Sequence, residues 1–373
     1  MKDFSNKHLS AKLPNPRPEI ERMNAYSAPL EGRRELLRLD FNENTIGPSP
    51  KVVEAIRNFL PAHIAIYPEY SGLKEAVVKN INSSNISNPI NSNQVGIFNG
   101  VDAAIHAIFH SFGVVNSKLL TTIPTFGYYS PCALMQGMEI IEIPYEGNNF
   151  QFPFNAIYKS LVEIHPKLLV ICNPNNPTGT KLAASKILEL ANASPETLII
   201  IDELYESFLG ESVLPISNFK TIPNLVVLRS LSKTSGLAGL RIGFAIGHPE
   251  IINHMRSVTG PYDVNSFAVK AAFAALSDQQ YINNYVKQVL KARIWIQERL
   301  ITYKIKHHME SGNFFLLWPK KNVYDVESSL KSYGILVRNM SAKPYLQGGL
   351  RVSIGVTSQM QVFWEAFKKS DEI

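Results

Sequence analysis

The sequence predicts an α/β protein of two domains: a large domain with a mostly parallel, seven-stranded sheet between helices, and a smaller α+β domain. The chain has 373 residues, more than one domain of typical size needs. Its middle part alternates short apolar runs with stretches of helical periodicity. Several of these runs are continuously apolar, which is typical of strands covered by helices on both faces.

The large domain is expected to begin with helices and to continue with strands. A helix is predicted from Pro48, which suits a first turn, and a second helix from about Leu73. Apolar runs of strand length then follow, each ending in polar or turn-forming residues. In chain order these runs are Val95–Phe98, Leu119–Ile123, Ile140–Ile143, Leu168–Cys172, Leu198–Ile201, Leu225–Leu228 and Ile242–Ile246.

The part of the chain after Tyr262 has a different pattern of predicted helices and strands. It is helical to about Tyr303, and further helices are expected from about Tyr324 and Ser358. Between them lie three shorter apolar runs that predict strands. These runs are Phe314–Trp318, Ile335–Val337 and Leu350–Ile354.

These changes in composition and in the pattern of predicted elements suggest that the chain has three parts. Residues 1–46 are expected to form an N-terminal arm that packs on the small domain or a partner subunit, because their first 38 residues are rich in proline and charge. Residues 47–265 are expected to form the large, cofactor-binding domain. Residues 266–373 are expected to form the small C-terminal domain.

Composition narrows the classes of partner. The net charge is +6, but the basic residues are spread as pairs such as Lys320-Lys321. Nucleic-acid surfaces show clustered basic residues, so we expect anionic small molecules as partners, and neither nucleic acid nor a membrane. Two cysteines are too few for a disulfide framework, and no metal-ligand spacing is present. With no signal peptide or apolar span, a cytoplasmic enzyme is the expectation.

Ligands of open α/β sheets bind at the carboxyl ends of the strands. Two polar segments follow predicted strands and are therefore candidates for ligand binding. Asn99-Gly100-Val101-Asp102 follows the first run and opens a helix, whose free N–H groups suit an anion. The same pattern also ends many strands that bind nothing. The loop 173–179 contains three asparagines. An ordinary turn explains its prolines and glycine, but not why amides crowd the end of a strand.

Two further segments carry ionisable groups. Asp202 ends a very apolar run, where a carboxylate is costly unless it is paired. It is either a helix N-cap or the partner of a buried cation, with Tyr205 three residues further on. Ser230, Ser232 and Lys233 precede Arg241, a combination that suits a phosphate ester beside a reactive carbonyl. The alternative is a solvated loop.

Together the four segments suit pyridoxal phosphate (PLP). A helix N-terminus, two serines and an arginine match its phosphate. Asp202 is expected to pair with the ring nitrogen and keep it protonated, so that the ring withdraws electrons strongly. Asn176 and Tyr205 are expected to contact the ring hydroxyl. Lys233 is expected to form a Schiff base with the aldehyde.

The sequence resembles the fold-type I PLP-dependent aminotransferases of class I/II, and within them the histidinol-phosphate aminotransferase group. The resemblance rests on eight stretches in family order across residues 39–355, of which the fifth and seventh are fairly specific. The stretches are LDFNENTIGPSP (39–50), IYPEYSGLKEAV (66–77), NGVDAAI (99–105), PTFGYY (124–129), NPNNPTGT (173–180), DELYESF (202–208), LRSLSKTSGLAGLRIGF (228–244) and LRVSIG (350–355).

The resemblance assigns catalytic and cofactor-binding roles. It implies that Lys233 is the Schiff-base lysine and proton shuttle, and that Phe126 stacks on the cofactor ring. Tyr67 matches a tyrosine that reaches the cofactor phosphate of the neighbouring subunit, which implies a homodimer with shared sites. The other cofactor contacts that it implies are Asp202, Asn176, Tyr205, Ser230, Ser232, Arg241 and the amides of Val101 and Asp102.

The resemblance also assigns the substrate side. Arg351 matches the arginine for the substrate carboxylate, and Arg338 matches a second substrate-side arginine. Tyr26 in the arm and Asn42 match residues near the substrate. The group implies histidine biosynthesis and a ping-pong reaction in which histidinol phosphate gives its amino group to 2-oxoglutarate.

Three departures keep other substrates open. Phe126 replaces a usual tyrosine, Ile66 a common arginine and Ala103 a common glutamate. The alternatives are an aminotransferase for aromatic or other amino acids and a threonine-phosphate decarboxylase on the same scaffold. Regulators that fuse this fold to a DNA-binding domain form a third class. They carry an extra N-terminal domain, for which the 38 residues before the first stretch are too few.

Overall fold

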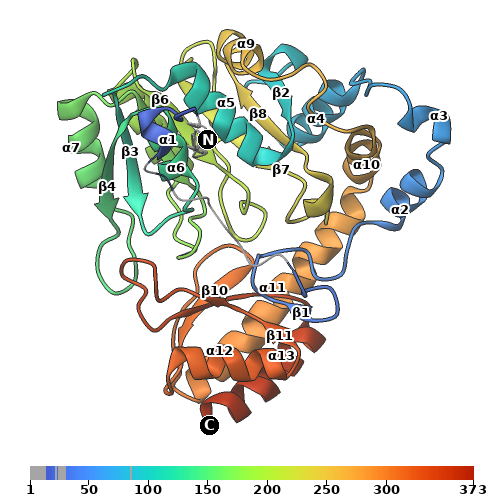
Figure 1. Cartoon of the computed structure of the whole chain (residues 1–373), viewed down its shortest axis with the longest axis vertical. Coiled ribbons are helices and arrows are strands. Elements are labelled where there is room, and N and C mark those ends of the chain that lie inside the picture. Colours follow the sequence, from blue (N-terminus) through green and yellow to red (C-terminus); the bar gives the residue numbers. More distant parts are fainter. Residues whose placement is uncertain (1–13, 22, 24–30, 85) are drawn as a thin grey trace, which may run out of the picture.

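The computed structural model describes residues 14–21, 23, 31–84 and 86–373, and it has a large body above a smaller one (Figure 1). All seven predicted strands form, in one sheet of order β2-β8-β7-β6-β5-β3-β4. Only β8 runs antiparallel to its neighbours, so the prediction of a mostly parallel sheet is confirmed. The strands are β2 (Val95–Phe98), β3 (Lys118–Ile123), β4 (Glu139–Pro144), β5 (Leu168–Cys172), β6 (Leu198–Asp202), β7 (Leu225–Ser230) and β8 (Gly243–Gly247).

Helices cover both faces of this sheet, which explains why its strands are continuously apolar. In β5, Leu169 and Ile171 pack into the core on one face, whereas Leu168 and Val170 pack into the core on the other. Alternate side chains of a strand point to opposite faces, so both sets must be apolar. The first face is covered by α2 (Pro50–Arg57), α4 (Leu73–Asn82), α7 (Phe154–Ile164), α8 (Ala184–Ala193) and α10 (Ser266–Ser277), and the second by α5 (Gly100–Phe112), α6 (Tyr129–Met135) and α9 (Pro249–Ser257).

The first predicted helix starts later than expected. We expected it from Pro48, but α2 begins at Pro50 and Ser49 is its N-cap. The Ser49 hydroxyl accepts a hydrogen bond from the N–H of Lys51 at 3.2 Å, which satisfies a free donor of the first turn. Pro50 then takes the first helical position, where its missing N–H costs nothing. Together with α3 (Pro61–Ile64), α2 projects from one side of the molecule (Figure 1).

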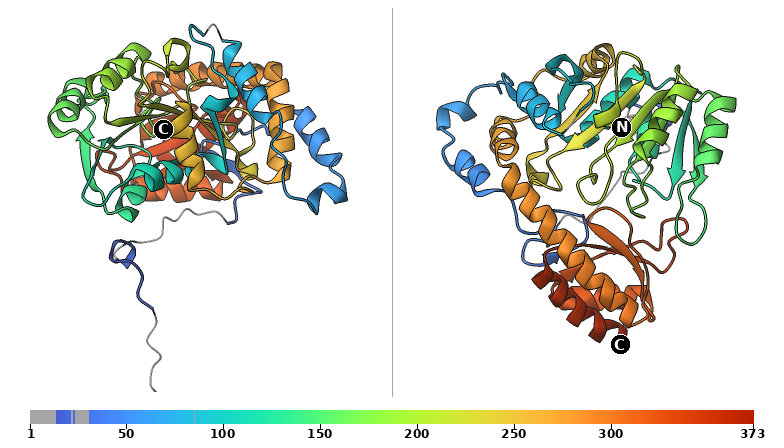
Figure 2. Two further views of the ribbon diagram at one scale, coloured as in Figure 1. Left: turned by 90° about the horizontal axis from the view of Figure 1, so that it is seen from above. Right: turned by 180° about the vertical axis from the view of Figure 1, so that it is seen from behind.

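The smaller body is built on a four-stranded antiparallel sheet of order β12-β13-β10-β9. The long helix α11 runs from the large body into it (Figure 2). β9 and β12 were not expected, because they have only three and two residues and no apolar run. The elements are α11 (Gln279–Thr302), β9 (Lys306–His308), β10 (Phe314–Trp318), α12 (Val323–Ser332), β12 (Arg338–Asn339), β13 (Leu350–Ser353) and α13 (Thr357–Asp371).

The N-terminal part of the chain contributes a strand to the smaller body. β1 (Leu37–Arg38) pairs in parallel with β11 (Ile335–Leu336), and Leu39 is buried in the core of the small sheet. Conversely, α10 follows residue 265 but packs into the core of the large sheet. The remaining short helices are α1 (Pro18–Glu21), η1 (Ser92–Gln94), η2 (Leu214–Ile216) and η3 (Ala238–Leu240).

Across the described residues, no helix combines the length and the apolar character needed to cross a bilayer.

Candidate active site

A cavity lies where β5, β6 and β7 end and α5 begins. Ten residues predicted from the sequence line it, although they come from five separate segments of the chain. Three other lining residues, Cys172, Leu204 and Ala238, were not predicted. The ten predicted residues are Val101, Asp102, Phe126, Asn176, Asp202, Tyr205, Ser230, Ser232, Lys233 and Arg241.

Asp202 is the last residue of β6, and its carboxylate is buried in this cavity. Its side chain accepts hydrogen bonds from the hydroxyl of Tyr129, at 2.6 Å, and from the N–H of Leu204, at 3.3 Å. Burial raises the pKa of Asp202 to about 6, and the Tyr129 hydrogen bond opposes that rise. A buried carboxylate that lines a cavity in this way suits pairing with a cation bound there.

Tyr205 lies three residues after Asp202, in the turn that follows β6, and is the centre of a polar cluster. Its hydroxyl accepts hydrogen bonds from the amides of Asn42, at 3.2 Å, and Asn176, at 3.4 Å. The side-chain amide oxygen of Asn176 accepts a hydrogen bond from Nη1 of Arg351 at 2.6 Å. Asn42, Asn176, Tyr205 and Arg351 are all buried. The cluster therefore joins the large sheet to β13 of the small one.

Lys233 points its amine into the same cavity. Its Nζ donates to the backbone carbonyl of Phe41 at 2.9 Å. Burial, followed by the charge of Arg351, lowers the pKa of Lys233 to about 8. An amine with such a pKa loses its proton near neutral pH, as a nucleophile or general base requires.

The opposite end of the cavity collects groups that bind anions. The hydroxyl of Ser230 donates to that of Ser232 at 2.9 Å, and the guanidinium of Arg241 binds Asp102 at 2.8 Å. Arg241 comes so close to the start of α5 that a Cβ at Gly100 would lie 2.5 Å from Nη2. Gly100 also has φ +76°, so glycine alone suits this approach of guanidinium to helix N-terminus.

A buried ion pair ties the ends of β6 and β7 together. Glu203 is fully buried and binds Arg229 at 3.0 Å, and Arg229 also pairs with Glu206. Burial raises the pKa of Glu203 to about 7. The pair holds adjacent strand ends in register, which positions Asp202 of β6 relative to Ser230 of β7.

Some predicted residues lie outside the cavity. Arg338 lies across from Arg351 in the β12–β13 pairing, and its guanidinium carbon is 5.8 Å from the ring centre of Phe41. Tyr67 is 71% exposed and stacks on Tyr262, with ring centres 4.0 Å apart. Tyr26 lies outside the residues that the structure describes.

Besides the three lining residues named above, sequence reasoning missed two hydrogen-bonding groups of the site. The first is Tyr129, although it lies in a stretch that we singled out. A buried carboxylate needs a donor, so the apolar setting of Asp202 signalled a partner of this kind without saying which residue it is. The second is the backbone carbonyl of Phe41, which no sequence pattern marks.

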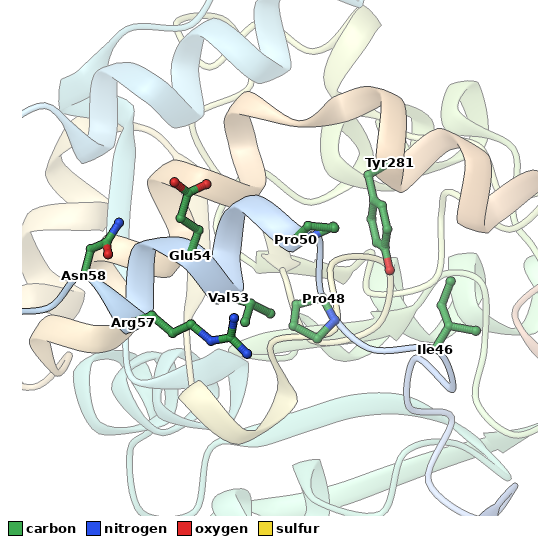
Figure 3. Close-up of a pocket in the computed structure, with 8 residues that line it drawn as sticks. All are labelled: Ile46, Pro48, Pro50, Val53, Glu54, Arg57, Asn58 and Tyr281. Carbon is green, nitrogen blue, oxygen red and sulfur yellow. The ribbon is translucent and has the colours of Figure 1, made fainter.

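A second hollow lies beside α2, and none of the predicted residues lines it (Figure 3). Ile46 and Val53 are exposed there, next to Tyr281. Among the described residues, no group of three or more histidine, cysteine or acidic side chains is arranged to hold a metal ion.

The comparisons with known proteins agree on a family. The family model "Aminotransferase class I and II" matches residues 34–367. A dihydroxyacetone phosphate transaminase of Campylobacter jejuni is 33% identical over 338 residues, which are 90% of each chain. A histidinol-phosphate aminotransferase of Leuconostoc citreum is 32% identical and covers 81% of this chain and 86% of its own.

A solved structure matches over nearly the whole fold. The histidinol-phosphate aminotransferase of Sinorhizobium meliloti, in complex with pyridoxal 5'-phosphate, superposes with a TM-score of 0.85. The match covers 97% of this chain and 99% of that one at 21% identity. It supports the predicted fold.

Proposed function

The chain belongs to the class I and II aminotransferases and is therefore a PLP-dependent enzyme, and we propose that it transfers the amino group of histidinol phosphate to 2-oxoglutarate. The observation that carries the proposal is the pair Arg338 and Arg351, which lie opposite each other on neighbouring strands, while the charge of Arg351 acts on Lys233. Such a pair offers two anion-binding groups beyond those for the cofactor's own phosphate. The phosphate of histidinol phosphate needs one such group, and the two carboxylates of 2-oxoglutarate need both.

The residues of the cavity fit PLP by their chemistry. Ser230, Ser232, Arg241 and the free N–H groups of α5 form the end suited to a phosphate. The carboxylate of Asp202 suits the ring nitrogen at the other end, and the amides and hydroxyl around Tyr205 suit the ring hydroxyl. When bound, PLP supplies an aldehyde for amines and a ring that withdraws electrons from the reacting carbon.

Lys233 is the residue that we propose to hold the cofactor covalently and to move protons. Its lowered pKa leaves part of the amine neutral at physiological pH. The neutral Nζ can then take the α-proton of the amino donor and later return it, as general acid–base catalysis requires. We propose that Asp202 stays ionised in the complex and keeps the ring nitrogen protonated, and that Phe126 packs on the ring. Two half-reactions at one site imply ping-pong kinetics.

The two arginines are proposed to bind the groups that distinguish donor from acceptor. Arg351 is held by Asn176, and its guanidinium is buried, so it suits the carboxylate or phosphate nearest the reacting carbon. Arg338 is less buried and suits the outer anionic group. Asn42, and by the family resemblance Tyr26, complete the substrate side of the proposal.

A panel of amino donors tests the substrate. Purified enzyme is mixed with 2-oxoglutarate and with histidinol phosphate, histidinol, phenylalanine, aspartate or threonine phosphate, and glutamate formation is measured. Histidinol is the matched control, because it lacks only the phosphate. We expect kcat/KM for histidinol phosphate to exceed that for histidinol about 100-fold or more, the value of one lost pairing with buried arginine. A preference for phenylalanine, or carbon dioxide release from threonine phosphate, contradicts the proposal.

The Campylobacter relative favours a second candidate, in which glutamate aminates dihydroxyacetone phosphate. That substrate is also a phosphate monoester, so the same arginines could serve it. The panel therefore includes glutamate with dihydroxyacetone phosphate, and formation of 2-oxoglutarate is followed. A higher kcat/KM for this pair than for histidinol phosphate selects the second candidate and leaves the chemistry unchanged.

We also propose that the enzyme is a homodimer in which Tyr67 reaches the cofactor phosphate of the partner subunit. The support is an exposed apolar strip around α3, where large hydrophobic side chains are exposed to solvent. Such strips mark contact surfaces. Its members, with more than half of each side chain's surface exposed, are Leu60, Ile64, Ile66, Tyr67 and Tyr262.

Subunit mixing tests the shared site. Lys233→Ala and Tyr67→Ala variants, each inactive or weak alone, are co-expressed and the hybrid dimers are isolated by two tags. If Tyr67 acts across the interface, both lesions fall in one site, and the other site is intact. Hybrids then recover about half of wild-type kcat, since one site of two is whole. Hybrids no more active than half of the Tyr67→Ala parent would mean that Tyr67 acts within its own subunit.

We propose that the enzyme works in a reducing compartment such as the cytoplasm. In support, Cys132 and Cys172 are both buried and free of disulfides.

A further inference from the structure

We propose that Arg33 is a positioning residue of the active site: it clamps the segment Asp40–Glu43, and through that segment it sets the positions of Lys233 and Arg351. The inference rests on the roles proposed above for these two residues. Arg33 lies outside the cavity and in none of the stretches that the family resemblance covers.

The guanidinium of Arg33 holds the segment from both ends. Its Nε and Nη2 donate to the two carboxylate oxygens of Asp40 at 3.0 and 2.7 Å. Its Nη1 and Nη2 donate to the carboxylate of Glu43 at 3.3 and 3.0 Å. Its guanidinium carbon also lies 4.1 Å from the ring centre of Phe41. One planar group thus makes paired contacts that a lysine, with its single ammonium, cannot reproduce.

The clamped segment touches the proposed catalytic groups through its backbone and one side chain. The carbonyl of Phe41 accepts the hydrogen bond of Lys233 Nζ at 2.9 Å, and the carbonyl of Asp40 accepts one from Arg351. The amide of Asn42 donates to the hydroxyl of Tyr205 at 3.2 Å. Three consecutive residues therefore hold three functional side chains, and any displacement of this segment displaces all of them.

The backbone of the segment is held on both sides. Asn42 has φ 55°, in the left-handed region that asparagine adopts more readily than other residues with a side chain. Its own N–H donates to Ser353 and its carbonyl accepts from Asn313, while Arg33 holds the residues before and after it. The side chain of Arg33 is only 11% exposed and that of Asp40 only 6%, so water cannot replace their pairing.

Arg33 also balances charge next to the reactive amine. The charged groups that act on Lys233 are, besides its burial, Arg351 and Arg241, which favour the neutral amine, and Glu43 and Asp102, which favour the protonated one. Arg33 binds Glu43 at 3.0 Å and, together with Arg38 at 3.3 Å, offsets its charge. Loss of the Arg33 charge therefore favours the protonated amine of Lys233.

The test compares Arg33→Lys and Arg33→Gln with Arg34→Gln, a control at the neighbouring position, where the side chain is exposed. We expect kcat with the best donor to fall about 100-fold in Arg33→Gln, the cost of misplacing reacting groups by about 1 Å, and less in Arg33→Lys. Arg34→Gln keeps wild-type kcat.

A second measurement needs no substrate. The pKa of Lys233 is obtained in the cofactor-free proteins from the pH dependence of its acetylation, followed by mass spectrometry. We expect Arg33→Gln to raise it by about one unit and Arg33→Lys, which keeps the charge, to leave it nearly unchanged. This separates charge from geometry, and it gives an answer even if every proposed donor proves wrong.

Two outcomes overturn the proposal. One is a folded Arg33→Gln enzyme with wild-type kcat and an unshifted Lys233 pKa. The other is an equal loss of activity in Arg34→Gln, which would mean that the whole arm and not the clamp matters. If Arg33→Gln fails to fold, Arg33→Lys and Glu43→Gln decide: both break one side of the clamp, so both must lower kcat.

Discussion

The hydrogen bond from Tyr129 to Asp202 gives the sharpest quantitative prediction. Tyr129 is fully buried, and Tyr129→Phe removes only the hydroxyl that donates to Asp202 at 2.6 Å. A hydrogen bond to a charged group contributes about 1.5–3 kcal/mol. At about 1.4 kcal/mol per unit, its loss raises the pKa of Asp202 by about one to two units. In the cofactor-free protein the pKa should therefore move from about 6 to about 7–8.

The change has a measurable effect on cofactor binding. A protonated ring nitrogen needs an ionised Asp202, so protonation of this carboxyl competes with the complex. From the shifted pKa, the ionised fraction at pH 7 falls about two- to tenfold, and PLP affinity should fall by the same factor. The loss should vanish toward pH 9, where Asp202 is ionised in both proteins.

The assay is a pH titration of Asp202 in the cofactor-free protein by carboxyl-selective NMR, with PLP affinity measured at pH 7 and pH 9. Tyr128→Phe is the matched control, since it removes a hydroxyl one residue away that contacts His106 instead. It should leave the pKa of Asp202 where it is. An Asp202 pKa that moves by less than about 0.3 unit in Tyr129→Phe, or an affinity loss equal at both pH values, refutes the reasoning.

Three other predictions concern the same cavity. Lys233→Ala should bind PLP without covalent attachment, so that borohydride leaves no adduct, and turnover should fall about 10⁴-fold or more; an active variant would refute the role of Lys233. Asp202→Asn should make the cofactor-free protein more stable above pH 7 by up to about 3 kcal/mol. The folded pKa of Asp202 is raised from 3.8 to about 6, so wild-type stability declines as the pH rises through this window, and urea unfolding at pH 4 and pH 7.5 measures the difference. Arg241→Gln should weaken PLP binding about 10- to 100-fold while leaving the affinity for pyridoxal, which lacks the phosphate, unchanged; equal losses for both would show that Arg241 does not serve the phosphate.

The strands were predictable because their signal is local. A strand buried on both faces must be apolar at every position, and the continuous runs at Leu168–Cys172 and Leu198–Ile201 meet that condition wherever the chain folds. The polar residues at the ends of these strands were also predictable, because their signal is local too. A buried carboxylate such as Asp202 at the end of so apolar a run is costly unless a ligand or a partner offsets its burial.

The start of α2 and the short strands of the small sheet were harder. Pro48 and Pro50 both suit a first helical turn, and the choice depended on which residue had a cap, Ser49, in front of it. β12 has two residues and no pattern of its own. It becomes a strand because β13 offers it hydrogen-bond partners.

By itself, the sequence determined the seven-stranded sheet, the edge of it that carries the candidate site, and nine residues of the cavity, because burial and strand ends leave marks on adjacent residues; the tenth, Phe126, followed from the family resemblance. Only the tertiary structure decided which of these residues form hydrogen bonds with each other. Tyr129 meets Asp202 across 73 positions, and Lys233 meets the carbonyl of Phe41 across 192. These partners are chosen by how helices and strands pack, and no local pattern records a contact between residues so far apart along the chain.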